Sequence, residues 1–222
     1  MVYRRTDNVV RRLAARRAEI LKAAEALAAE GGMGAVQIAP VAARAGIAAG
    51  TVYRYFPAKT DLVAALVADM SGREIVALRR AADAAPGPLS ALAAAIGTFA
   101  ARALKARRLA WALLAEPVDA EIDAVRLGYR KRLTEELQGR IATASAGSHL
   151  PDQDALLAAS AVGGALLEGL LGPFAADLGD NPAKTHAAVQ SLTLHCLRAL
   201  GVVDARARGL VVQIALPKEG AA

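Results

Sequence analysis

The sequence has little of what disulfide-linked or metal-binding proteins are built from. Its 222 residues include one cysteine and three histidines. A single cysteine, Cys196, cannot form an internal disulfide, and the scattered histidines do not have the spacing of metal ligands. We therefore expect no metal and no cofactor, and a reducing, cytoplasmic setting.

Aromatic residues and long apolar segments are also scarce. Aromatics make up 4% of the chain while hydrophobic residues make up 55%, so the apolar content is mostly small, helix-favouring alanine. The longest charge-free run, residues 84–101, contains Pro86-Gly87-Pro88 and predicts no membrane-spanning helix. The N-terminal arginines are not followed by an apolar segment and a cleavage site, so no signal peptide is expected.

The net charge of +6 lies entirely in the first third of the chain. Residues 1–80 hold 13 basic and 7 acidic residues, which gives +6, and the remaining residues hold 14 of each, which gives zero. This asymmetry favours one domain that meets a polyanion and a second that does not. A solvated basic face with no partner is the alternative.

Apolar positions recur at helical spacing along most of the chain. Arg16 and Arg17 interrupt the apolar stripe of the first helix, so its first turns should project past the core, and the stripe should be continuous from Ile20. The segment 210–214 is rich in β-branched residues and is expected to be either extended and packed, or disordered. The predicted helices cover residues 8–30, 38–44, 49–55, 58–82, 89–106, 108–115, 118–145, 152–171 and 183–200.

Two of these helices have the spacing of a helix-turn-helix. Residues 38–44 and 49–55 are joined by Ala45-Gly46-Ile47, where Gly46 can take a positive φ and Ile47 can fill the corner. An ordinary pair of packed helices is the alternative interpretation. The basic segment before them favours the helix-turn-helix.

The segment from Val41 to Lys59, VAARAGIAAGTVYRYFPAK, resembles the signature of the tetracycline-repressor (TetR) family of transcriptional regulators. The resemblance is close over residues 10–70 and beyond them rests on the number, length and order of the helices. It implies an all-α dimer that binds a palindromic operator as a repressor and is released by a small effector.

The resemblance also divides the chain. An N-terminal helix-turn-helix DNA-binding domain with a basic arm would span residues 1–57. A connecting helix over 58–85 would join it to a C-terminal helical bundle, residues 86–203, for effector binding and dimerisation. Residues 204–222 would be a tail.

Residues 49–55 would be the recognition helix in the major groove. Thr51 and Tyr53 can donate to phosphates, Lys59 supplies a further phosphate contact, and the guanidinium fork of Arg54 suits guanine O6 and N7. Of the nearby aromatics, Phe56 is expected in the core. The predicted DNA-binding residues are Arg4, Arg5, Gln37, Ala48, Ala49, Gly50, Thr51, Tyr53, Arg54, Tyr55 and Lys59.

Several positions in this region depart from the family pattern. Ala48 stands where the family usually has a serine cap, and Gln37 where it usually has threonine or serine, so both short helices should be weakly capped, by about 1 kcal/mol each. Ala39 and Ala49 offer no side-chain hydrogen bonds to DNA. Direct readout should therefore depend on Arg54, on thymine methyl contacts and on DNA shape.

In the second domain the large side chains are candidates for the wall of an effector site. Plain core packing is the alternative for each of them. The lone carboxylate Glu168 could orient an effector or could pair with a basic residue of a neighbouring helix or of a dimer partner. The candidates are Phe99, Trp111, Leu114, Tyr129, Glu168 and Phe174.

Small residues around Gly163 and Gly164, together with the helix over 183–200, are expected to form the dimer interface as a four-helix bundle. Two other functions remain open at this point. An effector-independent architectural DNA-binding protein would have a filled second domain, and an enzyme would need a site assembled in space, because no catalytic sequence motif is present.

Overall fold

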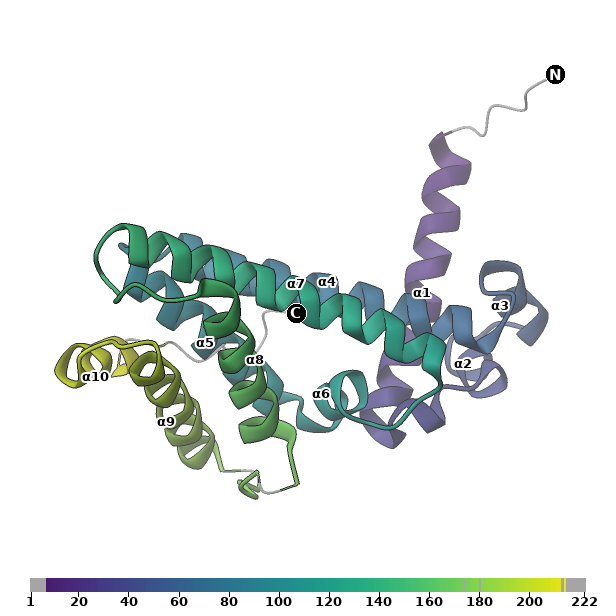
Figure 1. The fold of residues 1–222 in the computed structure, drawn as a ribbon. Helices are drawn as coiled ribbons and strands as arrows, with labels where there is room; N and C mark the ends of the chain where they lie inside the picture. The colour runs from purple at the N-terminus through teal and green to yellow at the C-terminus, as the bar shows by residue number, and fades with distance from the viewer. Residues whose placement is uncertain (1–6, 174, 180, 213, 215–222) are drawn as a thin grey trace.

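The computed structural model describes residues 7–173, 175–179, 181–212 and 214, and in these residues the chain is helical throughout, with no strand (Figure 1). The all-α prediction is confirmed. The elements are α1 (Asp7–Gly31), the 3₁₀ helix η1 (Met33–Ala35), α2 (Ile38–Arg44), α3 (Ala49–Tyr55), α4 (Lys59–Asp83), α5 (Pro88–Lys105), α6 (Arg107–Leu114), α7 (Ala120–Ala146), α8 (Ala155–Leu171), α9 (Pro182–Ala199) and α10 (Asp204–Val212).

The second half of α1, together with α2 and α3, forms a three-helix head at one end of the molecule (Figure 1). Its core is made of aliphatic side chains that are fully or almost fully buried, among them Ile20, Ala24, Val41 and Val52. Phe56 is buried as well, as predicted from its place after α3. Burial of this apolar face holds together short helices that are too short to be stable alone.

The first half of α1 projects from the head (Figure 1). Residues 8–19 are exposed apart from the half-buried Leu13, and burial begins at Ile20. This confirms the prediction made from Arg16 and Arg17, and leaves about 18 Å of helix outside the core. The Arg17 guanidinium lies 5.2 Å from the ring centroid of Phe56, a cation–π contact at the base of the projection.

The remaining helices form the larger part of the molecule, in which α4 and α7 run alongside each other (Figure 1). α5 packs against α4, α7 and α9, and α8 packs against α7. The core between them is mostly Leu, Ile and Ala, with Leu66, Leu92, Ile96, Leu137 and Leu166 fully buried.

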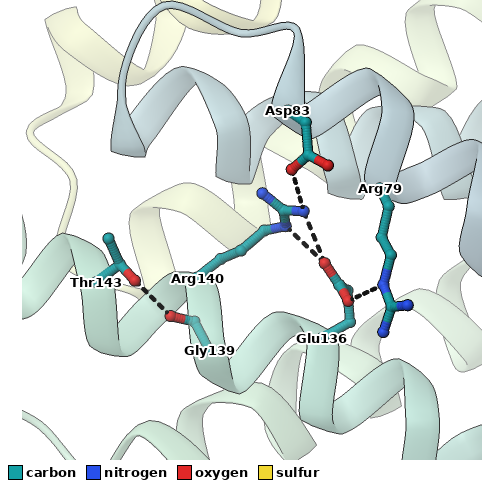
Figure 2. Close-up of polar contacts among 6 residues, drawn as sticks. All are labelled: Arg79, Asp83, Glu136, Gly139, Arg140 and Thr143. Atoms are coloured by element: carbon teal, nitrogen blue, oxygen red, sulfur yellow. Dashed lines mark hydrogen bonds and ion pairs between the residues drawn. The ribbon is translucent and has the colours of Figure 1, made fainter.

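A polar network ties the C-terminal end of α4 to α7 (Figure 2). Glu136 accepts hydrogen bonds from Arg79 Nε at 2.5 Å and from Arg140 Nη2 at 2.7 Å. Arg140 Nη2 also donates to Asp83 Oδ1 at 3.0 Å. Glu136 and Arg140 are only 11% and 16% exposed, so the pair between them is better shielded from water than an ordinary surface ion pair, whereas Arg79 and Asp83 are 57% and 70% exposed.

Helix boundaries differ from the predicted ones by a few residues at two starts. α7 begins at Ala120 rather than 118, and α8 begins at Ala155 rather than 152. Asp154 caps α8, because its Oδ1 accepts the backbone N–H of Leu156 and Leu157 at 2.9 and 3.0 Å.

The expectation that residues 210–214 are extended or disordered was wrong over residues 210–212. These residues end α10, which packs against α9 and α5 and buries Leu210 and Val211. Asp204 starts the helix and accepts a hydrogen bond from Arg208 at 2.9 Å. Burial against neighbouring helices overrides the weak β-preference of these residues. Residues 213 and 215–222 lie outside the described part.

Within the described residues, no single helix has the length and apolar character needed to cross a membrane. The pair α5 and α6, bent by 107° at their junction, meets the same length and composition test when the two helices are taken together.

Candidate DNA-binding surface and ligand cavity

The turn between α2 and α3 has the backbone that its sequence predicts. Gly46 has φ +64°, which glycine adopts without strain. The Ile47 N–H donates to the carbonyl of Ala42 at 3.0 Å, and the Ile47 side chain packs against the core. The turn therefore fixes the angle at which α3 leaves α2.

Neither short helix has a side-chain cap at its start. The side chain of Ala48 makes no capping hydrogen bond to α3, and that of Gln37 makes none to α2, as predicted. Gln37 instead donates from Nε2 to the carbonyl of Gly34 at 2.9 Å. Packing of Val41 and Val52 into the head, rather than capping, holds the two helices.

The predicted DNA-binding residues that the structure describes lie on the open surface of the head. Thr51 and Tyr55 are half-buried, and Tyr53 is 51% exposed. Arg4 and Arg5 lie outside the described residues. The remaining predicted residues, Gln37, Ala48, Ala49, Gly50, Arg54 and Lys59, are exposed.

A basic groove, which the sequence analysis did not identify, runs between the projecting half of α1 and α3. It has a volume of about 400 Å³, and its charged lining residues are Arg12, Arg16, Glu19 and Arg54. Arg16 forms an ion pair with Glu19 at 2.6 Å, and Glu19 supplies the one carboxylate among the lining residues. Arg12 and Arg54 therefore have no carboxylate partner in the groove. Helical spacing could have indicated that Arg12 and Arg16 share a face, but not that this face meets Arg54.

A polar junction joins the head to the segment after α6. The Met33 N–H donates to Glu116 Oε2 at 2.8 Å, and Gly32 has φ +75° beside that carboxylate. A Cβ at Gly32 would lie 2.7 Å from Glu116 Oε2. The backbone conformation therefore requires glycine here, and an added Cβ would also displace the Glu116 carboxylate.

Arg126 of α7 fixes the other side of this junction. It is 4% exposed and donates to the backbone carbonyls of Glu116 and Ala112, while its Nε has no partner among the described residues. Burial lowers the pKa of Arg126. α4 is thus not the sole link between the two parts of the molecule, since α6 also packs against α1 and its end is tied to η1.

A small cavity of about 50 Å³ lies between α4, α5, α6 and α7. Its lining is mostly apolar and includes three of the predicted effector residues, Phe99, Leu114 and Tyr129. Trp111 is 37% exposed and is not part of the lining, and Glu168 is exposed on α8, away from it. Phe174 lies outside the described residues. The other lining residues are Val67, Met70, Ser71, Glu74, Arg102, Ala103, Ala106, Leu109, Ala110 and Leu113.

The polar groups of the cavity gather at one side. Arg102 donates from Nε and Nη2 to the two carboxylate oxygens of Glu74, at 2.6 and 2.7 Å, and this hydrogen bonding raises the pKa of Arg102. Arg132 donates to Ser71 Oγ at 2.7 Å. Tyr129 is 2% exposed, and its burial followed by the nearby Glu74 charge raises the pKa of the hydroxyl. Tyr129 therefore stays protonated.

The outer face of α8 is apolar and rich in small residues. Leu156 and Leu157 are 53% and 68% exposed, and Gly164 is exposed, with open space where a Cβ would stand. A groove beside this face is lined by residues of α8 and α9, including His195 and Cys196. Burial raises the pKa of the Cys196 thiol to about 11, so it stays a neutral side chain. Among the described residues no group of three potential metal ligands is found.

Residues 20–66 match the family model described as bacterial regulatory proteins, tetR family. The chain is 53% identical over 53 residues to the HTH-type transcriptional repressor KstR of Rhodococcus jostii (strain RHA1). That match covers 24% of this chain and 25% of the repressor, so the chain spans about a quarter of the length of the curated relative it matches.

Two solved structures share the fold over most of the chain. The regulator FadR from Bacillus subtilis in complex with stearoyl-CoA has a TM-score of 0.70 at 21% identity, covering 84% of this chain and 98% of FadR. RolR in complex with resorcinol has a TM-score of 0.67 at 22% identity, covering 94% of this chain and 98% of RolR.

Proposed function

We propose that the chain, whose residues 20–66 match the family model of bacterial regulatory proteins, tetR family, is a dimeric transcriptional repressor. The observation that carries this proposal is the head, in which a docked α3 presents its outer side chains on an exposed surface with arginines beside it. The function requires a cytoplasmic protein, because operator DNA is there.

The proposed DNA contacts follow from the exposure of the head. α3 enters the major groove, Arg54 reads a guanine, and Thr51, Tyr53 and Lys59 bind phosphates. The remaining candidates, Gln37, Ala48, Ala49, Gly50 and Tyr55, shape the contact surface, and Arg4 and Arg5 extend it. Two heads related by two-fold symmetry would place their recognition helices about 34–36 Å apart.

The proposed domain organisation assigns DNA binding to residues 1–57, the connecting helix to residues 58–85, and effector binding and dimerisation to residues 86–203. We add α10 to the last of these, because it packs on α5 and α9. The exposed small-residue face of α8, paired with α9, is the proposed dimer interface.

The proposed effector site is the cavity between α4, α5, α6 and α7. A volume of about 50 Å³ is far below the roughly 300–1,000 Å³ of usual ligand pockets, so a bound effector has to displace the walls. RolR and FadR share this fold and bind a small diphenol and an acyl-CoA respectively, so the fold alone does not select the ligand class.

A ligand that displaces the helices around the cavity would change the position of the head through two connections, α4 and α6. α4 begins at Lys59 beside α3 and is held at its far end by the network of Figure 2, so pressure from the cavity would tilt its head-proximal end. α6 would act through Glu116 and its contact with Met33. Coupling of about 1–3 kcal/mol, or 5- to 150-fold in operator affinity, is typical of such a change.

The test is a gel-shift assay with the protein and its own promoter fragment, with a scrambled fragment of equal length and composition as control. A shift of the promoter fragment and not of the scrambled fragment is expected. Equal binding to both fragments would favour an architectural DNA-binding protein, and no binding to either would contradict the proposal.

A further inference from the structure

The cavity contains one polar group for which the described residues offer no hydrogen-bond partner. Tyr129 is 2% exposed and lines the cavity, and no hydrogen bond from its hydroxyl to another described residue is found. A hydroxyl that faces a cavity and has no partner among the described residues can form a hydrogen bond with a ligand that enters the cavity.

The Tyr129 hydroxyl is also accessible from the cavity. In the described part of the chain, the side-chain atoms that are sealed from solvent and lack a partner are Arg126 Nε and Thr193 Oγ1. Tyr129 is not among them, so its oxygen keeps accessible surface. The rest of the Tyr129 side chain is buried, and Tyr129 lines the cavity. The accessible surface of its hydroxyl oxygen therefore faces that cavity.

Three charges lie near Tyr129, those of Glu74, Arg102 and Arg132. Arg132 is exposed to solvent and donates to Ser71 Oγ, whereas Glu74 and Arg102 compensate each other. Glu74 and Arg102 form a two-fold hydrogen-bonded ion pair, with side chains 24% and 31% exposed, on the same wall. An anionic ligand at Tyr129 would lie next to the Glu74 carboxylate, and a cationic one next to Arg102. Either would have to break the pair and leave a partly buried charge without its partner, which is costly.

We propose that the effector is a neutral molecule with an apolar body and one hydroxyl or carbonyl oxygen, and that Tyr129 anchors this oxygen by a hydrogen bond. This inference rests on the proposed function, because it assigns the ligand class of the same cavity. Ser71 and Glu74, which lie at the anchored side, belong to α4, so the ligand's polar end lies against the helix that begins beside α3.

The experiment uses three probes of one shape: toluene, 4-methylphenol and 4-methylbenzoate. Their dissociation constants are measured by titrating the methyl resonances of Val67, Met70 and Leu113, which line the cavity. We expect 4-methylphenol to bind about 2- to 10-fold more tightly than toluene, the gain of one neutral hydrogen bond, and 4-methylbenzoate to bind most weakly.

Tyr129→Phe should remove the preference for 4-methylphenol and leave toluene binding unchanged. Because the deleted hydroxyl has no protein partner, the Tm of the free protein should stay the same or rise. Thr193→Val is the matched control, since it also removes a buried hydroxyl without a partner but lies on α9 outside the lining. It should leave the order of the three probes unchanged.

The possible failures are distinguishable. If 4-methylbenzoate binds most tightly, or if Tyr129→Phe keeps the preference for 4-methylphenol, the neutral anchored ligand is wrong while the cavity remains an effector site. If none of the probes shifts the lining resonances, both the anchor and the proposed effector site are overturned. A clear loss of Tm in Tyr129→Phe would show that the hydroxyl has a structural partner, and would also overturn the anchor.

Discussion

The head and the helical bundle differ in how closely their sequences match those of known relatives, and therefore in how well a binding partner can be predicted for each. The head matches the family model over residues 20–66, and its short helices, turn and exposed α3 follow from local spacing. The bundle shares only its fold with solved relatives at about one-fifth identity, and its cavity is defined by side chains from four separate helices. Under the proposed function, a shared partner, DNA, would fix the residue spacing of the head, whereas a ligand that varies between relatives would leave only the scaffold of the bundle in common.

The largest loss of operator affinity is expected from a substitution that disrupts the proposed dimer interface, rather than from one within the DNA-binding head. Gly164→Leu places a large side chain on the exposed face of α8, where the protomer has open space, so the protomer should fold normally. The dimer should dissociate and operator binding should fall by more than about 100-fold, because one head binds a single half-site. Sedimentation and fluorescence anisotropy measure the two effects.

The control for that change is Gly128→Leu, an exposed helical glycine on α7 that also has open space. It should remain dimeric and bind DNA normally. A dimeric, fully active Gly164→Leu protein would show that the interface lies elsewhere.

The junction between the two regions should be the next most sensitive point. Gly32→Ala forces a side chain into a backbone with φ +75° and against Glu116, so it should cost about 1–3 kcal/mol of stability and weaken coupling between head and bundle. Gly34→Ala is the control, because a Cβ at Gly34 would have no heavy atom from elsewhere in the chain within 4 Å. Thermal unfolding of both variants checks the difference, and equal Tm values would mean that the junction is not strained by the added methyl.

Substitutions of Arg54 and Lys59 should distinguish base-specific recognition from electrostatic attraction to the DNA phosphates. Arg54→Ala should reduce discrimination at one base pair per half-site by about 1–3 kcal/mol, whereas Lys59→Ala should weaken binding to all sequences alike and lower the salt slope by about 0.9 for each phosphate no longer neutralised. Operator variants titrated at several salt concentrations measure both. Uniform weakening by Arg54→Ala would instead assign Arg54 to a phosphate, together with Arg12 in the basic groove.

The smallest effect concerns acid stability of the head. Hydrogen bonding to Arg44 lowers the pKa of Glu30 below its ordinary 4.5, so this ion pair stabilises the folded state at neutral pH and loses that contribution as the pH falls through 4.5 and below. Both side chains are exposed, so the effect should be slight. Glu30→Gln should flatten the dependence of Tm on pH between about 5 and 3. An unchanged pH profile would show that the pair does not contribute.

Local patterns predicted the head well. Gly46 at the turn, the missing caps at Gln37 and Ala48, the burial of Phe56 and the projection of α1 each follow from a few neighbouring residues. The helix bounds of the bundle followed equally from apolar spacing and from proline and glycine breaks.

Features that depend on long-range packing could not be predicted in this way. Trp111 and Glu168 looked like cavity residues by type, but the rotation of α6 and α8 about their own axes turns them to the surface. The contact between Met33 and Glu116 spans 83 residues, and Gly32 alone did not indicate its partner. α10 forms because neighbouring helices bury Leu210 and Val211, which no local preference indicates.

In the proposed function, a ligand bound in the bundle controls the affinity of the head for operator DNA. The direct measurement is operator affinity with and without a saturating ligand whose binding to the α4–α7 cavity has been established. We expect the ligand to weaken operator binding by about 5- to 150-fold, and operator DNA to weaken ligand binding by the same factor. A ligand that binds in the cavity and leaves operator affinity unchanged would show that the cavity does not control DNA binding, because a ligand with equal affinity for both states of the protein shifts neither.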